Sequence, residues 1–183
     1  MSRSLQPSRL NVTAFAQDGA ALTETTLLQN MERLAHEAQG LQPDSAVKWE
    51  AMGELRPRPG AEDDVWLHLI AGAVVPLTCQ RCMGVVATPV QVDQWYRFVA
   101  SEDIAMAEDD QSEEDLLVME PQFDLLAVLE DELLMALPLV PMHEECPVPP
   151  KLQAGELTEG DSAGTSGEKP NPFAVLVQLK VKK

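Results

Sequence analysis

Two neighbouring stretches, DVWLHLIAGAVVPLTC (64–79) and VVATPVQVDQWYRFVA (85–100), decide the fold. Along both stretches apolar side chains alternate with polar or amphipathic ones, which is the period of a strand with one buried face. A short turn, QRCMG (80–84), separates them. Two long strands joined by a short turn predict an antiparallel hairpin, with Cys79 and Cys82 near its tip.

The segments that precede this hairpin carry weaker patterns. RLNVTAF (9–15) places β-branched and aromatic residues at alternate positions and predicts a strand. SAVKWEAMGELRP (45–57) alternates in the same way and predicts another strand. Between them, residues 23–38 place apolar side chains at helical spacing, which predicts a helix.

The segment QFDLLAVLEDELLMALPLVP (122–141) carries the clearest helical pattern. Leucine recurs at every fourth residue from Leu125 to Leu137, the acidic run 130–132 covers the opposite side, and two prolines end the segment. Just before it, residues 102–120 contain nine acidic and no basic residues. That charge run predicts a solvated loop.

Together these segments predict an α+β fold. We expect an antiparallel β-sheet, open or barrel-like, that is packed by one long helix and forms a single domain over residues 1–148. Residues 149–170 are rich in Pro, Gly, Ser and Glu, which predicts a flexible, disordered linker. Residues 171–183 predict a short C-terminal helix, either a docking peptide or a helix packed on the core.

Composition bounds the class of protein. Hydrophobic residues are 45% of 183, enough for one buried core, but no run reaches the ~18–20 apolar residues of a membrane span. The N-terminus lacks the apolar core of a secretion signal. Three cysteines, an odd number, argue against a disulfide framework. We therefore expect a cytoplasmic protein with reduced thiols and no membrane partner.

The net charge argues about partners. Thirteen Lys and Arg residues oppose 30 Asp and Glu residues, giving a formal charge of −17. Such a body repels a phosphate backbone, so broad nucleic-acid binding is disfavoured. Contact with RNA must be local, or must be delivered through a basic partner.

The cysteines suggest a metal site. Cys79 and Cys82 form a C-x-x-C pair, and MHEECP after the long helix supplies His143 and Cys146 with the same offset. Four N or S ligands are what structural zinc requires, so the four residues predict a Cys₃His zinc site that joins the hairpin tip to the end of the helix. The competing interpretation is that the cysteines are small apolar turn residues and that the histidine is exposed.

Enzymatic interpretations are weaker. A thioredoxin-like C-x-x-C opens a helix, whereas a strand is expected after Cys82. The chain has no Gly-rich phosphate loop, no H-E-x-x-H and no G-x-S-x-G. We expect no catalysis and no small-molecule substrate.

Three blocks in the same order, LTCQRC, DLLAVLEDELLMALPLVPMHEEC and KPNPFAVLVQLK, resemble the large ribosomal RNA subunit accumulation protein family (YceD). The resemblance covers roughly residues 65–183. It implies a non-enzymatic role in the synthesis, processing or stability of large-subunit ribosomal RNA, and hence in ribosome biogenesis. The positions that match the family are Cys79, Arg81, Cys82, Asp124, Leu125, Glu130, Asp131, Glu132, Pro138, Pro141, His143, Cys146, Asn171, Pro172 and Phe173.

The resemblance leaves the partners open. We expect an rRNA precursor or basic ribosomal or assembly proteins, and the acidic charge favours the proteins. Two alternatives remain: a zinc-stabilised protein-interaction module unrelated to ribosomes, and an acidic mimic of nucleic acid. The residues expected to mediate interaction are Arg81, Asp124, Glu130, Asp131, Glu132, Asn171, Pro172 and Phe173.

Overall fold

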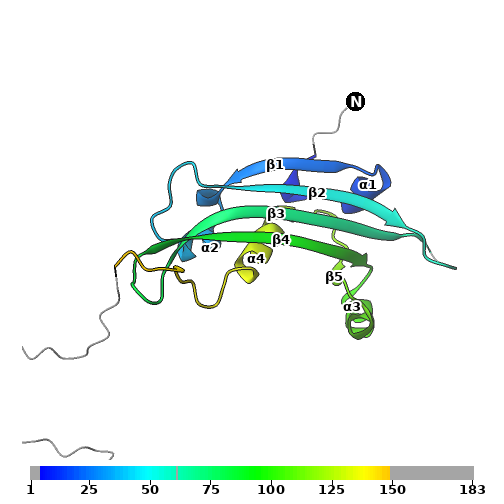
Figure 1. Ribbon diagram of the computed structural model, residues 1–183. Helices are drawn as coiled ribbons and strands as arrows, with labels where there is room; N and C mark the ends of the chain where they lie inside the picture. Colours follow the sequence, from blue (N-terminus) through cyan, green and yellow to red (C-terminus); the bar gives the residue numbers. More distant parts are fainter. Residues whose placement is uncertain (1–4, 61, 149–183) are drawn as a thin grey trace, which may run out of the picture. The chain divides into compact units, whose positions relative to one another are not determined.

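A five-stranded sheet forms the centre of the computed structural model, which describes residues 5–60 and 62–148 (Figure 1). The expected linker (149–170) and C-terminal helix (171–183) lie outside the described residues. In sheet order the strands are β1 (Ala21–Leu27), β2 (Ala46–Arg56), β3 (Asp64–Thr78), β4 (Val85–Val99) and β5 (Asp115–Val118).

The sheet is mixed and open. The first four strands pair antiparallel with their sequence neighbours, whereas β5 runs parallel to β4 and pairs only with Tyr96–Val99. Since β1 and β5 are the two edges, the sheet does not close on itself. The α+β class is confirmed, and the expectation of a purely antiparallel or barrel-like sheet is wrong.

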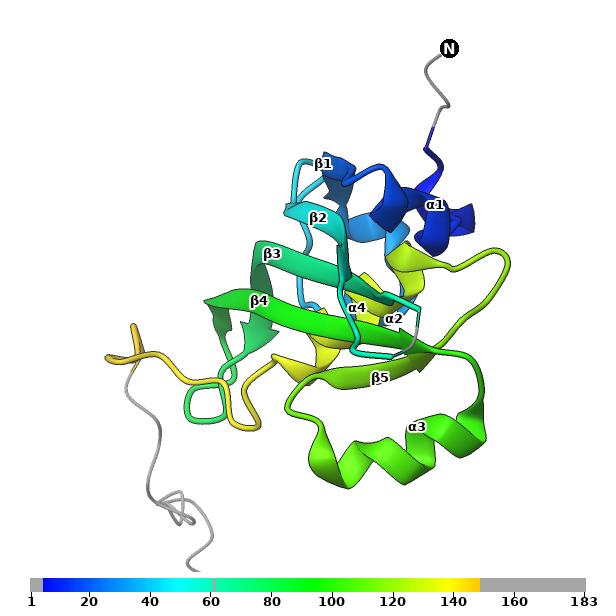
Figure 2. The same ribbon diagram turned by 90° about the vertical axis from the view of Figure 1, so that its right-hand side faces the viewer.

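The predicted hairpin is confirmed as β3 and β4, which are 15 residues each. Their register runs from Val65 opposite Phe98 to Thr78 opposite Val85. Along β3 the side chains of Val65, Leu67 and Leu69 are buried in the core, as the alternation predicts. Helices cover this inner face, and the opposite face of the sheet carries none of them (Figure 2).

The N-terminal predictions exchanged helix and strand. Residues expected as a strand form helix α1 (Val12–Gln17), whose first turn is capped by the Asn11 side chain accepting from Ala14 N at 2.9 Å. The start of the expected helix over 23–38 is instead strand β1, and only its end forms a short helix, α2 (Glu32–Glu37). Three threonines between residues 23 and 26 favour the extended conformation.

Helix α4 (Leu125–Met135) packs against the inner face of the sheet. Leu125, Leu129 and Leu133 are fully buried, so the predicted leucine stripe faces the core. The helix is shorter than the expected 122–141, because the chain leaves helical geometry before the first of the two prolines.

The acidic segment is ordered, contrary to the expected loop. It forms helix α3 (Glu102–Glu108), a 3-10 turn and strand β5, and α3 lies beyond the β5 edge of the sheet (Figure 2). The buried Arg97 of β4 donates to Glu114 at 2.6 Å, to Glu108 at 2.7 Å and to Ser112 at 2.9 Å. One arginine therefore neutralises two carboxylates of this segment and fixes it to the sheet.

Candidate metal centre

The turn between β3 and β4 presents two cysteines on one side. Cys79, directly after β3, donates its backbone N–H to Gly84 O at 2.8 Å and accepts from Met83 N at 2.9 Å. Met83 has a φ of +59°, a left-handed conformation that lets the chain reverse within five residues. This tight turn brings the Cys79 and Cys82 thiols to the same side.

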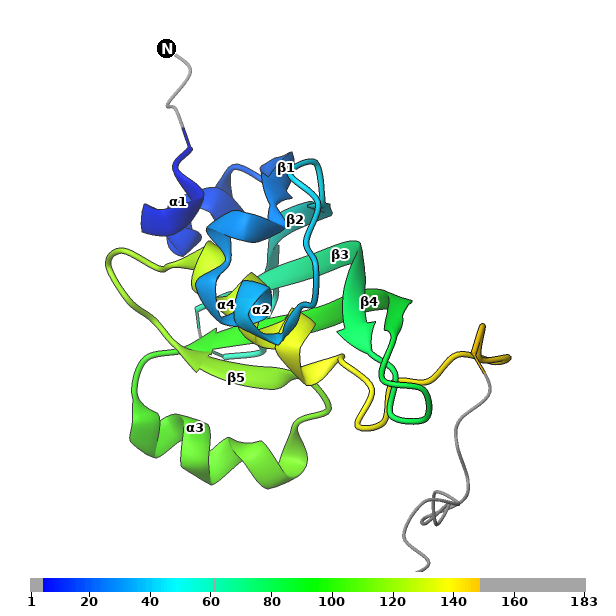
Figure 3. The same cartoon turned by 90° about the vertical axis from the view of Figure 1, so that its left-hand side faces the viewer.

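The segment after α4 crosses beside this turn (Figure 3). Gln80 N donates to Pro141 O at 2.9 Å. The Arg81 guanidinium donates to the carbonyl oxygens of His143 and, at 2.9 Å, of Glu144. These backbone contacts hold residues 141–146 against the hairpin tip without any metal.

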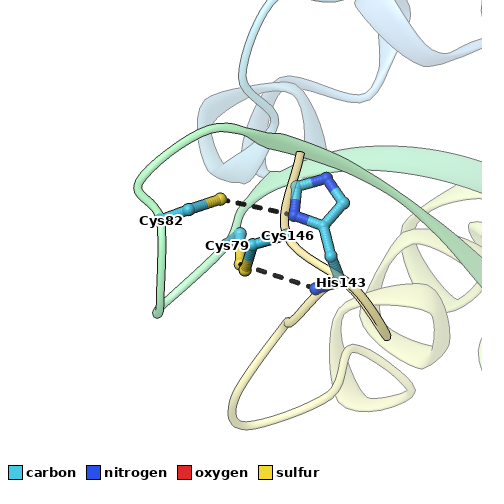
Figure 4. Close-up of side chains that lie close together, drawn as sticks. All are labelled: Cys79, Cys82, His143 and Cys146. Atoms are coloured by element: carbon cyan, nitrogen blue, oxygen red, sulfur yellow. Dashed lines mark hydrogen bonds between the residues drawn. The ribbon is translucent and has the colours of Figure 1, made fainter. Parts of the chain in front are cut away.

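Four potential ligands converge where the two segments meet (Figure 4). The ligand atoms of Cys79, Cys82, His143 and Cys146 all lie within 4.8 Å of one another. Cys79 Sγ and Cys146 Sγ are 4.0 Å apart, and Cys82 Sγ lies 3.4 Å from His143 Nδ1. The chain thus brings together the four residues that the sequence predicts as ligands, from positions more than 60 residues apart.

These distances fit a tetrahedral metal. With Zn–S of about 2.3 Å and Zn–N of about 2.0–2.1 Å, a tetrahedron separates two sulfurs by about 3.8 Å and a sulfur from a nitrogen by about 3.6 Å. The observed 4.0 Å and 3.4 Å lie close to both values. The other imidazole nitrogen, His143 Nε2, is 3.0 Å from Val85 O, which is the outer-shell bond usual for a metal-binding histidine.

The cluster also favours a thiolate. Burial opposes ionisation of Cys79, but hydrogen bonds from the backbone of Cys82, His143 and Arg81 outweigh it and lower the pKa of the Cys79 thiol to about 5. Burial raises the pKa of Cys146, as do its contacts with Cys82 and Cys79. A divalent cation would relieve this competition between neighbouring thiols, since metal ligands must be deprotonated.

The geometry gives no support to a dithiol redox centre. All three cysteines are free, and the 4.0 Å between Cys79 and Cys146 sulfurs is far from the ~2.05 Å of a disulfide. Strand β4 follows Cys82, so no helix N-terminus stabilises its thiolate as in thioredoxin-like motifs.

The remaining predicted interaction residues are distributed over several roles. Asp124 caps α4 by accepting from Ala127 N at 3.0 Å. Glu130 accepts the backbone N–H groups of Arg33 and Leu34 at the start of α2, and Asp131 pairs with the Arg33 side chain. These three carboxylates stabilise the fold. Arg81 joins the two segments of the metal centre, Glu132 lies beside the β4 edge, and Asn171, Pro172 and Phe173 lie outside the described residues.

The sequence reasoning missed a cluster on the outer face of the sheet. His68 stacks on Trp95 with ring centroids 4.0 Å apart. The Arg56 guanidinium lies 4.0 Å from the Trp66 ring centroid and 4.2 Å from that of Trp95. The signal was present, because Trp66 and His68 alternate with the buried residues of β3.

The fold and the cluster together define an α+β protein in which a three-cysteine, one-histidine site joins two distant loops. Residues 67–180 match the profile of the family described as "Large ribosomal RNA subunit accumulation protein YceD". This match covers more than half of the chain, and the chain belongs to that family.

A named relative supports the assignment. The Haemophilus influenzae protein called "Large ribosomal RNA subunit accumulation protein YceD" is 40% identical over 117 residues, which cover 59% of this chain and 61% of the relative. The aligned region thus spans less than two thirds of that relative. No solved structure matches the chain. None of the helices in residues 5–60 and 62–148 has the length and apolar character needed to cross a bilayer.

Proposed function

We propose that this protein is a cytoplasmic, non-catalytic ribosome biogenesis factor, required for large-subunit ribosomal RNA to accumulate. The observation that carries the proposal is the family match over residues 67–180, which includes the Cys/His cluster and α4. The Haemophilus influenzae relative carries the same role in its name. The factor acts in the processing or the stability of the precursor.

The chemistry of the site supports a non-catalytic role. Four protein ligands complete a tetrahedron, and a closed four-ligand zinc site is structural, whereas catalytic zinc keeps a position open for water. The formal charge of −17 favours basic ribosomal or assembly proteins as the direct contacts over the RNA phosphates.

A sucrose-gradient profile of cells lacking the protein tests this function, with rRNA quantified in each fraction. We expect fewer large subunits, and less mature large-subunit rRNA relative to small-subunit rRNA. Re-expression of the full chain should restore both. Unchanged subunit and rRNA ratios would remove the ribosomal assignment.

A second proposal concerns the metal: the cluster binds one structural zinc ion, which the sulfur–sulfur and sulfur–nitrogen distances support. Purified full chain should contain stoichiometric zinc, and a chelator should lower its melting temperature. Cys82→Ser should have both effects, whereas Gln80→Ser in the same turn should have neither. If ribosome profiles are normal while zinc is bound, the protein is instead a zinc-stabilised interaction module.

A further inference from the structure

Strand β4 has a long free edge. Its partner β5 pairs only with Tyr96–Val99. Across residues 5–60 and 62–148, no strand pairs with the preceding part of β4, Val85–Gln94, on that side. An unpaired strand edge offers a row of N–H and C=O groups to another extended chain.

The direction of these backbone groups follows from Pro76 of β3. Pro76 O accepts from Gln39 N at 2.7 Å, so the backbone groups of Pro76 point away from β4. In an antiparallel ladder the residue opposite such a position also points away from its partner. That residue is Ala87. With a period of two, Gln91 and Asp93 point outward as well.

Two observed contacts agree with this assignment. Val85 O accepts from His143 Nε2 at 3.0 Å on the outer side, and Val99 O accepts from Met119 N at 2.8 Å beyond β5. Both residues share the parity of Ala87. A proline within a strand is tolerated where its missing N–H faces outward, and Pro89 has this parity too.

A hollow of about 250 Å³ lies between this edge and the C-terminal turn of α4. Met135 contributes an apolar wall and is 83% exposed. Glu132 of α4 and Asp93 of β4 line it, and no Lys or Arg does. The Asp93 side chain contacts His68 Nε2 at 2.6 Å yet stays 74% exposed. The hollow therefore suits a chain that combines apolar and basic side chains.

We propose that the β4 edge from Ala87 to Asp93 binds an extended, lysine- or arginine-bearing segment of a partner protein as an added strand. The outward backbone groups of Gln91 and Asp93 hydrogen-bond the segment. An apolar side chain of the segment packs on Met135, and its basic side chains pair with Glu132 and Asp93. This inference deepens the proposed function by naming the chemistry of the partner.

Other occupants fit less well. Single-stranded RNA would bring phosphates to a hollow lined by carboxylates without a basic side chain. A second copy of the chain would bring the same acidic edge and the same net charge. Both are outcomes of the test below.

The probe is a short fluorescent peptide of alternating valine and lysine, titrated into the full chain at physiological salt. Binding is followed by fluorescence anisotropy, and backbone amide exchange locates it. We expect saturable binding and slower exchange at Gln91 and Asp93, whose N–H groups point outward. A valine–glutamate peptide should not bind.

Matched variants separate the backbone from the side chain. Gln91→Pro removes one outward N–H, whereas Gln91→Ala keeps it. The proline variant should bind the peptide roughly threefold to tenfold more weakly, the loss expected for one hydrogen bond, and the alanine variant should bind normally. Methylating alternate backbone nitrogens of the peptide tests the same contact without altering the protein.

Several results would overturn the inference: no binding, equal binding of the methylated peptide, or binding without protection at Gln91 and Asp93. Tighter binding of single-stranded RNA, or a dimer that Gln91→Pro dissociates, would assign the edge to another occupant. The peptide assay is independent of the rRNA profile. Peptide failure with reduced rRNA leaves the proposed function standing, and the reverse result leaves the edge site standing.

Discussion

His143 Nε2 lies 3.0 Å from the carbonyl oxygen of Val85, the first residue of β4. A carbonyl can only accept, so Nε2 carries the proton and the lone pair of Nδ1 faces Cys82 Sγ at 3.4 Å. The hairpin therefore selects the neutral tautomer in which Nδ1 is the metal ligand. His143 belongs to the segment after α4, so this contact ties the site to both loops.

Replacing this histidine should weaken zinc binding more than it weakens the fold of the sheet. We expect His143→Ala to lower zinc affinity about a hundredfold or more, since a loss of ~10–100-fold is already typical when an outer-shell partner is removed. Competition with a chromogenic chelator measures it. His36→Ala is the control, because His36 is 87% exposed and outside the cluster. Equal zinc affinity of both variants would rule out His143 as a ligand.

The contact between α4 and α2 yields a stability prediction. The half-buried Glu130 carboxylate accepts from Arg33 N at 2.8 Å and Leu34 N at 3.1 Å, thereby satisfying two N–H groups at the start of α2. We expect Glu130→Ala to lower the free energy of unfolding by about 1–2 kcal/mol in urea titrations with zinc held saturating.

Asp131 is the matched control for this prediction. It pairs with the Arg33 side chain but is more than half exposed, and surface ion pairs contribute about 0–1 kcal/mol. Asp131→Ala should therefore cost less than Glu130→Ala. Equal costs would mean that the backbone contacts of Glu130 do not stabilise α2.

The hairpin and the metal ligands could be predicted because their signals are local. Fifteen residues of alternation specify each strand, and the C-x-x-C and H-x-x-C spacings identify ligands without knowledge of the fold. The N-terminal helix was missed because the alternation from 9 to 15 hid Asn11, whose side chain caps α1. An Asn before a run of helix-compatible residues is the signal that could have found it.

Other features depend on distant residues and could not be predicted. The acidic segment is ordered because Arg97 in β4 neutralises it, and charge counting within 102–120 cannot find that arginine. Glu130 looked like a docking residue because its partner is the start of α2, which the sequence had placed inside a longer helix. The free β4 edge became visible only with the short, parallel pairing of β5.

Gly53 is required for the close packing of α1 on β2. A Cβ atom there would lie 2.5 Å from Phe15 Cδ1 and 2.9 Å from Ala16 N, a backbone atom that cannot move aside. We expect Gly53→Ala to cost roughly 1–3 kcal/mol of unfolding free energy. Gly72→Ala is the control, since its nearest contact would be 3.9 Å from Val90 O. Similar melting temperatures for both variants would contradict the close approach.

The Arg97 network predicts how stability responds to acid. The hydrogen bond with Arg97 lowers the pKa of Glu108 below its ordinary 4.5. Burial opposes the same effect at Glu114, but Arg97 again prevails and lowers that pKa. A carboxyl whose pKa is lower in the folded state stabilises the fold above the unfolded pKa, and this contribution is lost as pH falls through the folded value.

Glu114→Gln isolates this contribution from the rest of the acidic chain. Above about pH 5 the variant should be roughly 1–2 kcal/mol less stable than the natural chain, because a neutral amide replaces a charged acceptor. The difference should shrink as pH falls from about 5 to about 3, where Glu114 becomes protonated in the natural chain. Urea unfolding at several pH values measures it. A difference that stays constant across this range would show that Glu114 does not act through its charge, and Glu113→Gln at an exposed neighbouring position should show no such pH dependence.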